Sequence, residues 1–311
     1  MTYTLLIAFA AMLWGSDLLL RPLVLHAGWA AARVVLWEHL LLTALFAVPL
    51  WRGRRALFAL TGRQRGALLF IAWGGSALAT WLYTTSFTLG QPLFSVLLQK
   101  TQPVFALALA GWLLKEKRAP LFWVWCVLAL AGAYALTGIR TVPNWQDAHW
   151  QQAACALGAA ALWGASTVAG RVLTPALPPA VLAGARFALA LPPLLLLALR
   201  KGGVSGALAQ SDQGHAWLFL LLIVLLPDLL GMVCYYAGLR QTTASVATLA
   251  ELCYPLSALI IGLTVQHAHL AAGQWLGLAL LIGSVVHLGA RPQVVSAAHA
   301  PEPIPALAPL T

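Results

Sequence analysis

Residues 12–24 read MLWGSDLLLRPLV and lie in an otherwise apolar segment near the N-terminus. A charged side chain at the centre of a lipid bilayer costs about 2.5–3.5 kcal/mol even on the most lenient insertion scale. Asp17 and Arg21 stand four residues apart, so on a helix they share one face and can pair, with Trp14 on the same face. The stretch therefore predicts either a neutralised structural ion pair or a helix face that lines a cavity, and both alternatives stay open.

The composition of the whole chain is that of a membrane protein. Of 311 residues, 61% are hydrophobic and 8% are charged, and the mean hydropathy is +0.85. A soluble domain carries about 25% charged residues, so this chain has too few charges to coat a surface in water. Apolar blocks of roughly 20 residues, each long enough to cross the hydrocarbon, alternate with short polar linkers. We predict an all-α membrane protein whose ten transmembrane helices lie at about residues 3–25, 29–51, 66–88, 92–114, 119–138, 152–173, 179–199, 216–239, 244–265 and 272–290.

The positions of the basic residues indicate how the chain is oriented in the membrane. The net charge of +10 does not indicate a nucleic-acid partner, because the arginines and lysines gather beside the apolar blocks. Such residues mark the cytoplasmic side of a membrane. With both termini inside, the inner linkers hold ten basic residues and the outer linkers three. We predict a multi-pass protein of the cell (inner) membrane with both termini in the cytoplasm. Residues 291–311, rich in Pro and Ala, are predicted to form a disordered cytoplasmic tail.

The second half of the chain repeats motifs of the first. The segment LWGS at residues 13–16 corresponds to LWGAS at residues 162–166, and Ala-Arg pairs follow in the next predicted span of each half. In this register Gln99 corresponds to Glu251. Five spans per repeat is an odd number, so the halves must insert with opposite topology, as in many secondary transporters. We predict two inverted five-helix repeats, at residues 1–140 and 141–290.

The order of these motifs resembles the EamA-type branch of the drug/metabolite transporter superfamily. The resemblance rests on LWG in spans one and six, an arginine early in spans two and seven, a proline midway through spans four and nine, and LKEK at residues 114–117. It covers about residues 3–290 and implies ten helices, alternating access and export of small metabolites. Two features depart from the family pattern: QHAH at residues 266–269, where the family has an acidic residue, and the charged residues Asp17, Arg21 and Glu38-His39.

Polar side chains inside the predicted spans are the candidates for a central cavity. Ser95, Gln99 and Gln102 form one polar stripe of span four, and Lys100 beside it is a candidate counter-charge for Glu251. Hydrogen bonding between helices is the alternative role for such stripes. Asp228 follows a proline and is either a proton site or a cap on the broken turn. We predict that the cavity for substrate and coupling is lined by Trp14, Asp17, Arg21, Glu38, Tyr83, Ser95, Gln99, Lys100, Asp228, Tyr235 and Glu251.

These features predict a secondary transporter that exports small metabolites, amino-acid-like or amphipathic, by alternating access. The predicted partners are a small-molecule substrate, the lipid bilayer and, if an acid in the apolar cavity is held neutral, protons. The four scattered cysteines show no metal-ligand spacing, and neither a metal nor a cofactor is predicted. An intramembrane enzyme is one alternative, but the sequence has no HExxH or GxSxG motif. A non-transporting scaffold or sensor is another, but it has no need of an inverted repeat with matched polar stripes.

Overall fold

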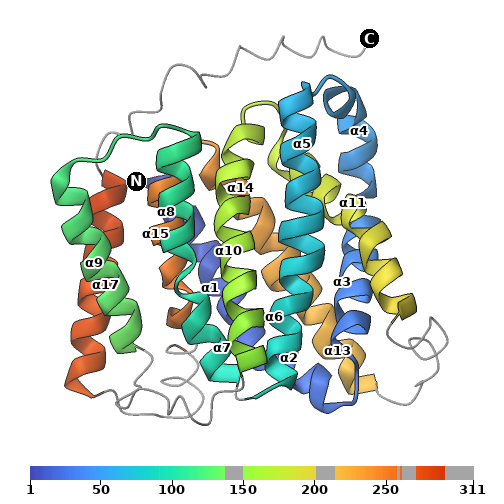
Figure 1. The fold of residues 1–311 in the computed structure, drawn as a ribbon, viewed down its shortest axis with the longest axis horizontal. Coiled ribbons are helices and arrows are strands. Elements are labelled where there is room, and N and C mark those ends of the chain that lie inside the picture. The colour runs from blue at the N-terminus through green and yellow to red at the C-terminus, as the bar shows by residue number, and fades with distance from the viewer. Residues whose placement is uncertain (91, 137–149, 201–213, 258–259, 261–270, 291–311) are drawn as a thin grey trace.

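The computed structural model describes residues 1–90, 92–136, 150–200, 214–257, 260 and 271–290. All regular elements in these ranges are helices (Figure 1), which confirms the predicted all-α class. The predicted tail at 291–311, the predicted repeat boundary near residue 140 and the segment 266–269 lie outside the described residues. The helices are α1 (Thr2–Gly15), α2 (Asp17–His26), α3 (Ala31–Leu45), α4 (Ala47–Phe58), α5 (Gly62–Phe70), η1 (Ile71–Leu78), α6 (Ala79–Thr88), α7 (Pro92–Gln99), α8 (Gln102–Leu113), α9 (Pro120–Leu136), α10 (Trp150–Leu173), α11 (Pro179–Arg200), α13 (Gly214–Ile223), η2 (Val224–Gly231), α14 (Met232–Leu239), α15 (Ala244–Ala250), η3 (Glu251–Cys253) and α17 (Ala272–Ala290).

The long apolar helices confirm a multi-pass membrane protein. Among the described residues, six helical stretches are long and apolar enough to cross a bilayer: Thr2–His26, Gly62–Thr88, Trp150–Leu173, Pro179–Leu199, Gly214–Leu239 and Ala272–Ala290. The pair α3 and α4 makes a seventh if its 77° bend falls within one span. The number ten stays a prediction, because α9 and the helices around α7–α8 and α15–η3 are each shorter than 18 residues, about the length of one membrane span.

Two of the long helical stretches change to π-helix near their middle. The π-helix η1 separates α5 from α6, and η2 separates α13 from α14. Pro227 lies inside η2, where its missing N–H disturbs the regular hydrogen-bond ladder. Wide turns of this kind frequently occur at functional sites.

The tryptophans of the two LWG motifs make equivalent contacts with these π-helices. Trp14 of α1 donates its indole N–H to the carbonyl oxygen of Pro227 in η2, at 3.1 Å. Trp163 of α10 donates its indole N–H to the carbonyl oxygen of Gly75 in η1, at 2.9 Å. Each motif therefore ties the first helix of its own half to a helix of the other half.

The helices pack so that elements of both halves alternate. In Figure 1, α9 and α17 lie side by side at one end of the molecule and α3 and α11 lie together at the other, with α10 between them. The glycines of the LWG motifs allow close approach in the middle. A Cβ atom on Gly15 would clash with the carbonyl oxygen of Tyr254, and one on Gly164 would press on the carbonyl oxygen of Gln102.

The acidic motif that follows α8 reaches into the second half of the chain. The Glu116 carboxylate accepts hydrogen bonds from the backbone N–H groups of Ala244 at 2.8 Å and Ser245 at 3.0 Å. The start of a helix carries a partial positive charge, so this carboxylate stabilises the N-terminus of α15. Because α15 runs directly into η3, Glu116 helps to fix the position of Glu251, the first residue of η3.

Candidate functional site

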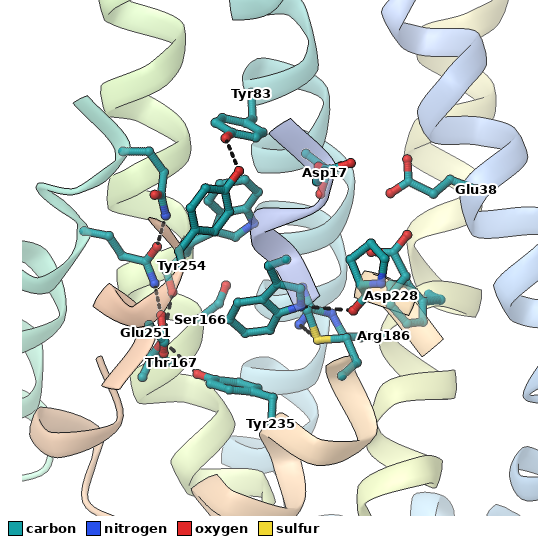
Figure 2. A pocket seen from close by; sticks show the side chains of 18 of the residues that line it. Asp17, Glu38, Tyr83, Ser166, Thr167, Arg186, Asp228, Tyr235, Glu251 and Tyr254 are labelled. Atoms are coloured by element: carbon teal, nitrogen blue, oxygen red, sulfur yellow. Dashed lines mark hydrogen bonds between the residues drawn. The ribbon is translucent and has the colours of Figure 1, made fainter. Parts of the chain in front are cut away.

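A cavity of about 110 Å³ lies between the helices of the two halves (Figure 2). That volume has room for several water molecules. Four carboxylates and two guanidinium groups face it together with aromatic rings. The lining residues are Trp14, Asp17, Arg21, Glu38, His39, Thr80, Tyr83, Gln99, Gln102, Trp163, Ser166, Thr167, Arg186, Phe187, Pro227, Asp228, Met232, Tyr235, Tyr236, Glu251 and Tyr254.

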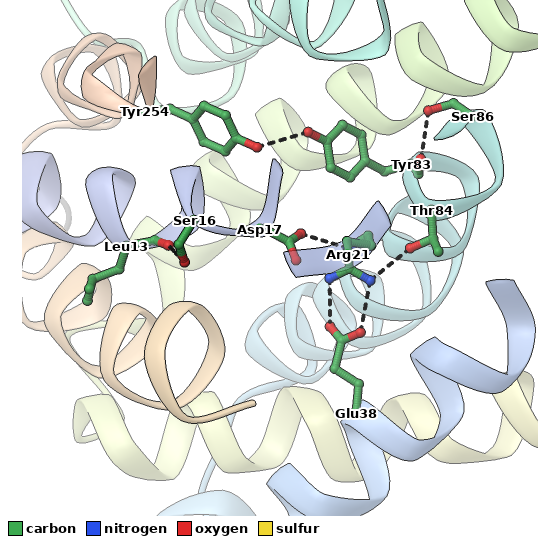
Figure 3. A network of polar contacts seen from close by, with 9 residues as sticks. All are labelled: Leu13, Ser16, Asp17, Arg21, Glu38, Tyr83, Thr84, Ser86 and Tyr254. Carbon is green, nitrogen blue, oxygen red and sulfur yellow. Dashed lines mark hydrogen bonds and ion pairs between the residues drawn. The ribbon is translucent and has the colours of Figure 1, made fainter. Parts of the chain in front are cut away.

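The first charged centre of the cavity is built around Arg21 (Figure 3). Its Nε donates to Asp17 Oδ2 at 2.7 Å, one helical turn earlier on α2. Its two terminal nitrogens donate to both oxygens of Glu38 on α3, at 3.0 and 3.3 Å, and Nη1 also donates to Thr84 Oγ1 at 2.9 Å. One cation therefore joins three helices, and the predicted pairing of Asp17 with Arg21 is confirmed.

The second centre is built around Glu251, whose hydrogen-bond partners are neutral side chains (Figure 2). Gln102 donates its side-chain amide to Glu251 Oε2. Thr167 donates to Oε1 at 3.2 Å, and Tyr235 in turn donates its hydroxyl to Thr167 at 2.9 Å. In the described ranges Glu251 has no ion-pair partner, since the ion pairs found there are both made by Arg21.

Aromatic rings form the walls between these centres. The hydroxyl groups of Tyr83 and Tyr254 lie 3.1 Å apart, which links α6 to the end of η3 across the cavity. The ring of Tyr83 contacts that of Trp163 with centroids 5.0 Å apart. The rings of Trp14 and Tyr235 have the same separation, 5.0 Å. Rings at these distances are in tilted and edge-to-face contact, and their faces and edges offer stacking surfaces to a flat ligand.

Arg186 of α11 is the other guanidinium group of the cavity, and neutral groups hold it. It donates through Nε to Ser76 Oγ at 2.6 Å and through Nη1 to Tyr236 Oη at 2.9 Å and Met232 Sδ at 3.3 Å. In the described part of the chain no three or more His, Cys, Asp and Glu side chains gather in a way that could hold a metal ion.

Nine of the eleven residues predicted from the sequence line the cavity, and Ser95 and Lys100 do not. Ser95 is buried on α7 and accepts a hydrogen bond from Gln152 at 3.0 Å. Lys100 lies over the ring of Tyr254, 3.8 Å from its centroid, and donates to Gln99 at 3.1 Å. Among the described residues Lys100 makes no ion pair with Glu251, although the two side chains interact electrostatically, as a counter-charge would. Gln99 and Gln102, on either side of the break between α7 and α8, both line the cavity and are joined by a hydrogen bond of 2.6 Å.

Sequence reasoning left other lining residues out of the predicted set. Two of them had a signal in the repeat, because Trp163 is the counterpart of Trp14, and Arg186 is the counterpart of an arginine in span two. The position of His39 beside Glu38 was also visible. Others come together through tertiary packing alone: Thr80, Ser166, Thr167, Phe187, Met232 and Tyr236.

Known proteins resemble this chain in sequence and in fold. The sequence profile described as "EamA-like transporter family" matches residues 1–138 and again residues 151–289. The riboflavin transporter ImpX of Fusobacterium nucleatum subsp. nucleatum is 29% identical over 304 residues, which cover 91% of this chain and 96% of that protein. A protein of known crystal structure superposes with a TM-score of 0.71 at 19% identity, over 91% of this chain and 95% of that chain, and so has the same fold.

Proposed function

The chain belongs to the EamA-like transporter family, and on this premise we propose that it is a secondary transporter of small, polar, aromatic molecules that works by alternating access. Membership and the named relative indicate a membrane transporter rather than an enzyme. The observation that carries the proposal is the cavity, because buried charges and aromatic rings from both matched segments meet in it. Ionisable groups inside a membrane protein are costly and mark pathways for substrates and ions.

Alternating access requires two halves that move against each other, and we propose two inverted five-helix repeats at residues 1–140 and 141–290. Two observations support them: the family profile matches twice, and the two LWG tryptophans make equivalent hydrogen bonds with η1 and η2. In known inverted-repeat transporters the substrate binds near the midplane between the repeats. The cavity lies between the corresponding segments here, and rocking of one half against the other would open it to either side.

The substrate class follows from the walls of the cavity and from the relative. Flat rings stack on aromatic side chains such as Trp14 and Trp163, and polar edges find carboxylate, amide and guanidinium partners nearby. Riboflavin, which the relative is named for, combines a flat polar ring with a hydroxylated chain and is the first compound to test. Export, which the family resemblance implies, and import would be told apart by net flux from each side.

The experiment is counterflow of labelled riboflavin in proteoliposomes, with and without a pH gradient. We expect the purified protein to exchange riboflavin and Trp14→Ala to reduce the exchange rate several-fold, because a ring contact is worth about 0.5–1.5 kcal/mol. Trp112→Ala is the matched control, since the Trp112 side chain is 76% exposed on the outer surface of α8. If the wild-type protein exchanges no riboflavin, riboflavin is not its substrate. If Trp14→Ala and Trp112→Ala lose equal exchange activity, the cavity is not the binding site.

We further propose that the protein lies in the cell (inner) membrane with both termini in the cytoplasm. The basis is the split of ten basic residues in the inner linkers against three in the outer linkers. Arg63 is exposed at the start of α5, in the linker that we place inside. A cysteine introduced as Arg63→Cys should react with an impermeant maleimide only when the cytoplasmic face is accessible. Reaction from outside alone would reverse the orientation.

A further inference from the structure

Four residues that line the cavity have a buried side-chain atom without a hydrogen-bond partner among the described residues. One is Ser166 Oγ, which can donate or accept, and the other three are acceptors: Asp17 Oδ1, His39 Nε2 and Asp228 Oδ2. Leaving a buried polar atom unpaired costs about 1–3 kcal/mol. Native structures keep few such atoms, and each one asks for an explanation, such as a role in binding. Three of them in one cavity, from α2, α3 and η2, indicate that this side of the cavity is built to receive hydrogen-bond donors.

The geometry around His39 fixes which ring nitrogen is the acceptor. Its Nδ1 lies 2.8 Å from the carbonyl oxygen of Val35, one turn earlier on α3. A carbonyl oxygen only accepts, so Nδ1 carries the hydrogen and Nε2 of the neutral ring presents a lone pair. The side chain is 1% exposed and its ring packs edge-on against Phe187 at 5.2 Å, so the lone pair cannot turn to bulk water.

The carboxylates near His39 are only partly compensated. Asp17 Oδ2 accepts a hydrogen bond from Arg21, and the terminal nitrogens of Arg21 donate to Glu38 and Thr84. Electrostatic interactions link Asp228 to Glu38, Arg21 and Asp17, and the side chains of Asp228 and Glu38 share a hydrogen bond. Figure 2 shows the three acids on the same side of the cavity. Three carboxyl groups thus share Arg21, while Arg186, which also interacts with His39, has hydrogen bonds to neutral groups. A donor, neutral or cationic, is attracted to this place, and an anion is repelled.

We propose that Asp17, His39 and Asp228 form an acceptor site that binds the N–H and O–H groups of the transported molecule. The cargo must therefore present several hydrogen-bond donors and no negative charge toward this site. The inference rests on the proposed function and narrows its substrate class. Riboflavin meets the requirement through its ribityl hydroxyls and its ring N–H, whereas a phosphate ester of the same ring would place an anion against carboxylates.

The first test compares flavins that share one ring, using fluorescence quenching on wild-type protein in lipid nanodiscs. Lumiflavin replaces the ribityl chain by a methyl group, and flavin mononucleotide adds a phosphate. We expect riboflavin to bind at least about 10-fold more tightly than either, as loss of one or two good hydrogen bonds implies. Equal affinity for riboflavin and lumiflavin, or tighter binding of the mononucleotide, would overturn the acceptor site.

Variants separate a binding role from a structural role. Asp228→Asn and His39→Leu should bring the ratio of riboflavin to lumiflavin affinity toward one, because they remove contacts that only the donor-rich ligand makes. A variant that merely disturbs the fold weakens both ligands alike and leaves the ratio unchanged, which would count against the proposal. Trp112→Ala, far from the cavity on the outer surface, should leave the ratio as in the wild type.

A second experiment tests the acceptor site with ligands that are not flavins. Phenethylamine and hydrocinnamate carry an ammonium or a carboxylate on similar apolar frames, and thermal unfolding reports which of them stabilises the protein. We expect stabilisation by the amine, smaller in Asp228→Asn. Stabilisation by the carboxylate, or by neither compound, would refute the acceptor site even if riboflavin is transported. Stabilisation by the amine without any flavin binding would instead refute riboflavin as cargo and keep the acceptor site.

Discussion

The two acidic centres of the cavity hold their carboxylates in different ways. Around Arg21, two carboxylates share a guanidinium group that is itself tied to a third helix through Thr84. Around Glu251, one carboxylate receives hydrogen bonds from an amide and a hydroxyl and has no cation at ion-pair distance in the described ranges. Both centres are buried in the same cavity, so the difference lies in their partners and not in their exposure.

This difference separates a structural role from a titrating one. A buried carboxylate with a bidentate guanidinium partner keeps its charge, because protonation would leave the cation unpaired. When a buried carboxylate with neutral hydrogen-bond partners takes up a proton, no ion-paired cation is left without its partner, and the hydrogen bonds can rearrange. We therefore expect the Arg21 centre to hold helices together and the Glu251 centre to respond to pH.

The largest expected effect is that of Arg21→Met. The change leaves Asp17 and Glu38 buried without a cation, and breaking a buried ion pair in this way costs about 3–5 kcal/mol. Thermal unfolding in detergent should show a large loss of stability. Arg63→Met, at an exposed position of α5, is the matched control. An unfolding temperature equal to that of the control would show that the Arg21 centre is not structural.

Glu251→Gln is expected to change coupling more than stability. Glutamine keeps the size of the side chain and an acceptor oxygen, so the protein should fold and bind its substrate. If transport is proton-coupled, flux in proteoliposomes should lose its dependence on the pH gradient. Glu38→Gln is the comparison: it should lower stability, because it weakens the pairing with Arg21, and keep the pH response in the protein that folds. If Glu38→Gln instead abolished the pH response and Glu251→Gln lowered stability, the Arg21 centre would be the titrating one and the Glu251 centre the structural one.

Tyr235→Phe tests the outer part of the Glu251 centre with a smaller effect. It removes the hydroxyl that donates to Thr167, which in turn donates to Glu251. We expect a loss of about 1 kcal/mol in unfolding free energy, the value of one hydrogen bond. A double-mutant cycle with Glu251→Gln should show coupling of about 0.5 kcal/mol or more. Tyr236→Phe, whose hydroxyl serves Arg186 instead, is the control and should be additive with Glu251→Gln.

The smallest expected effect is that of removing the residues after Arg291. Both acidic centres are formed by residues far upstream of this segment, and the segment lacks the apolar periodicity of a packed element. A truncated protein should keep the riboflavin exchange rate and the unfolding temperature of the full chain. If a stably expressed truncation lost riboflavin exchange, the residues after Arg291 would be required for transport, contrary to this prediction.

The parts of the site that were predictable from the sequence are local or repeated. Asp17 and Arg21 pair because four residues on a helix bring them together whatever surrounds that helix. Trp14 and Trp163 both line the cavity, and their shared motif already indicated equivalent places in two halves. Lys100 was predicted to line the cavity, but its ammonium group lies over the ring of Tyr254, and residue spacing does not show a contact between residues so far apart in the chain.

The sequence by itself determined that the chain is helical and spans a membrane several times, because the length and low charge of its apolar blocks match the hydrocarbon thickness. It also determined the family, through the order and duplication of short motifs. The tertiary structure alone decided that Glu38 joins Arg21, that Gln102 and Thr167 hold Glu251, and that His39 lines the cavity. The physical reason is that a charged or polar side chain in an apolar bundle is satisfied by whichever helix packs beside it. Packing fixes that neighbour across long distances in the sequence, such as the separation of 149 positions between Gln102 and Glu251.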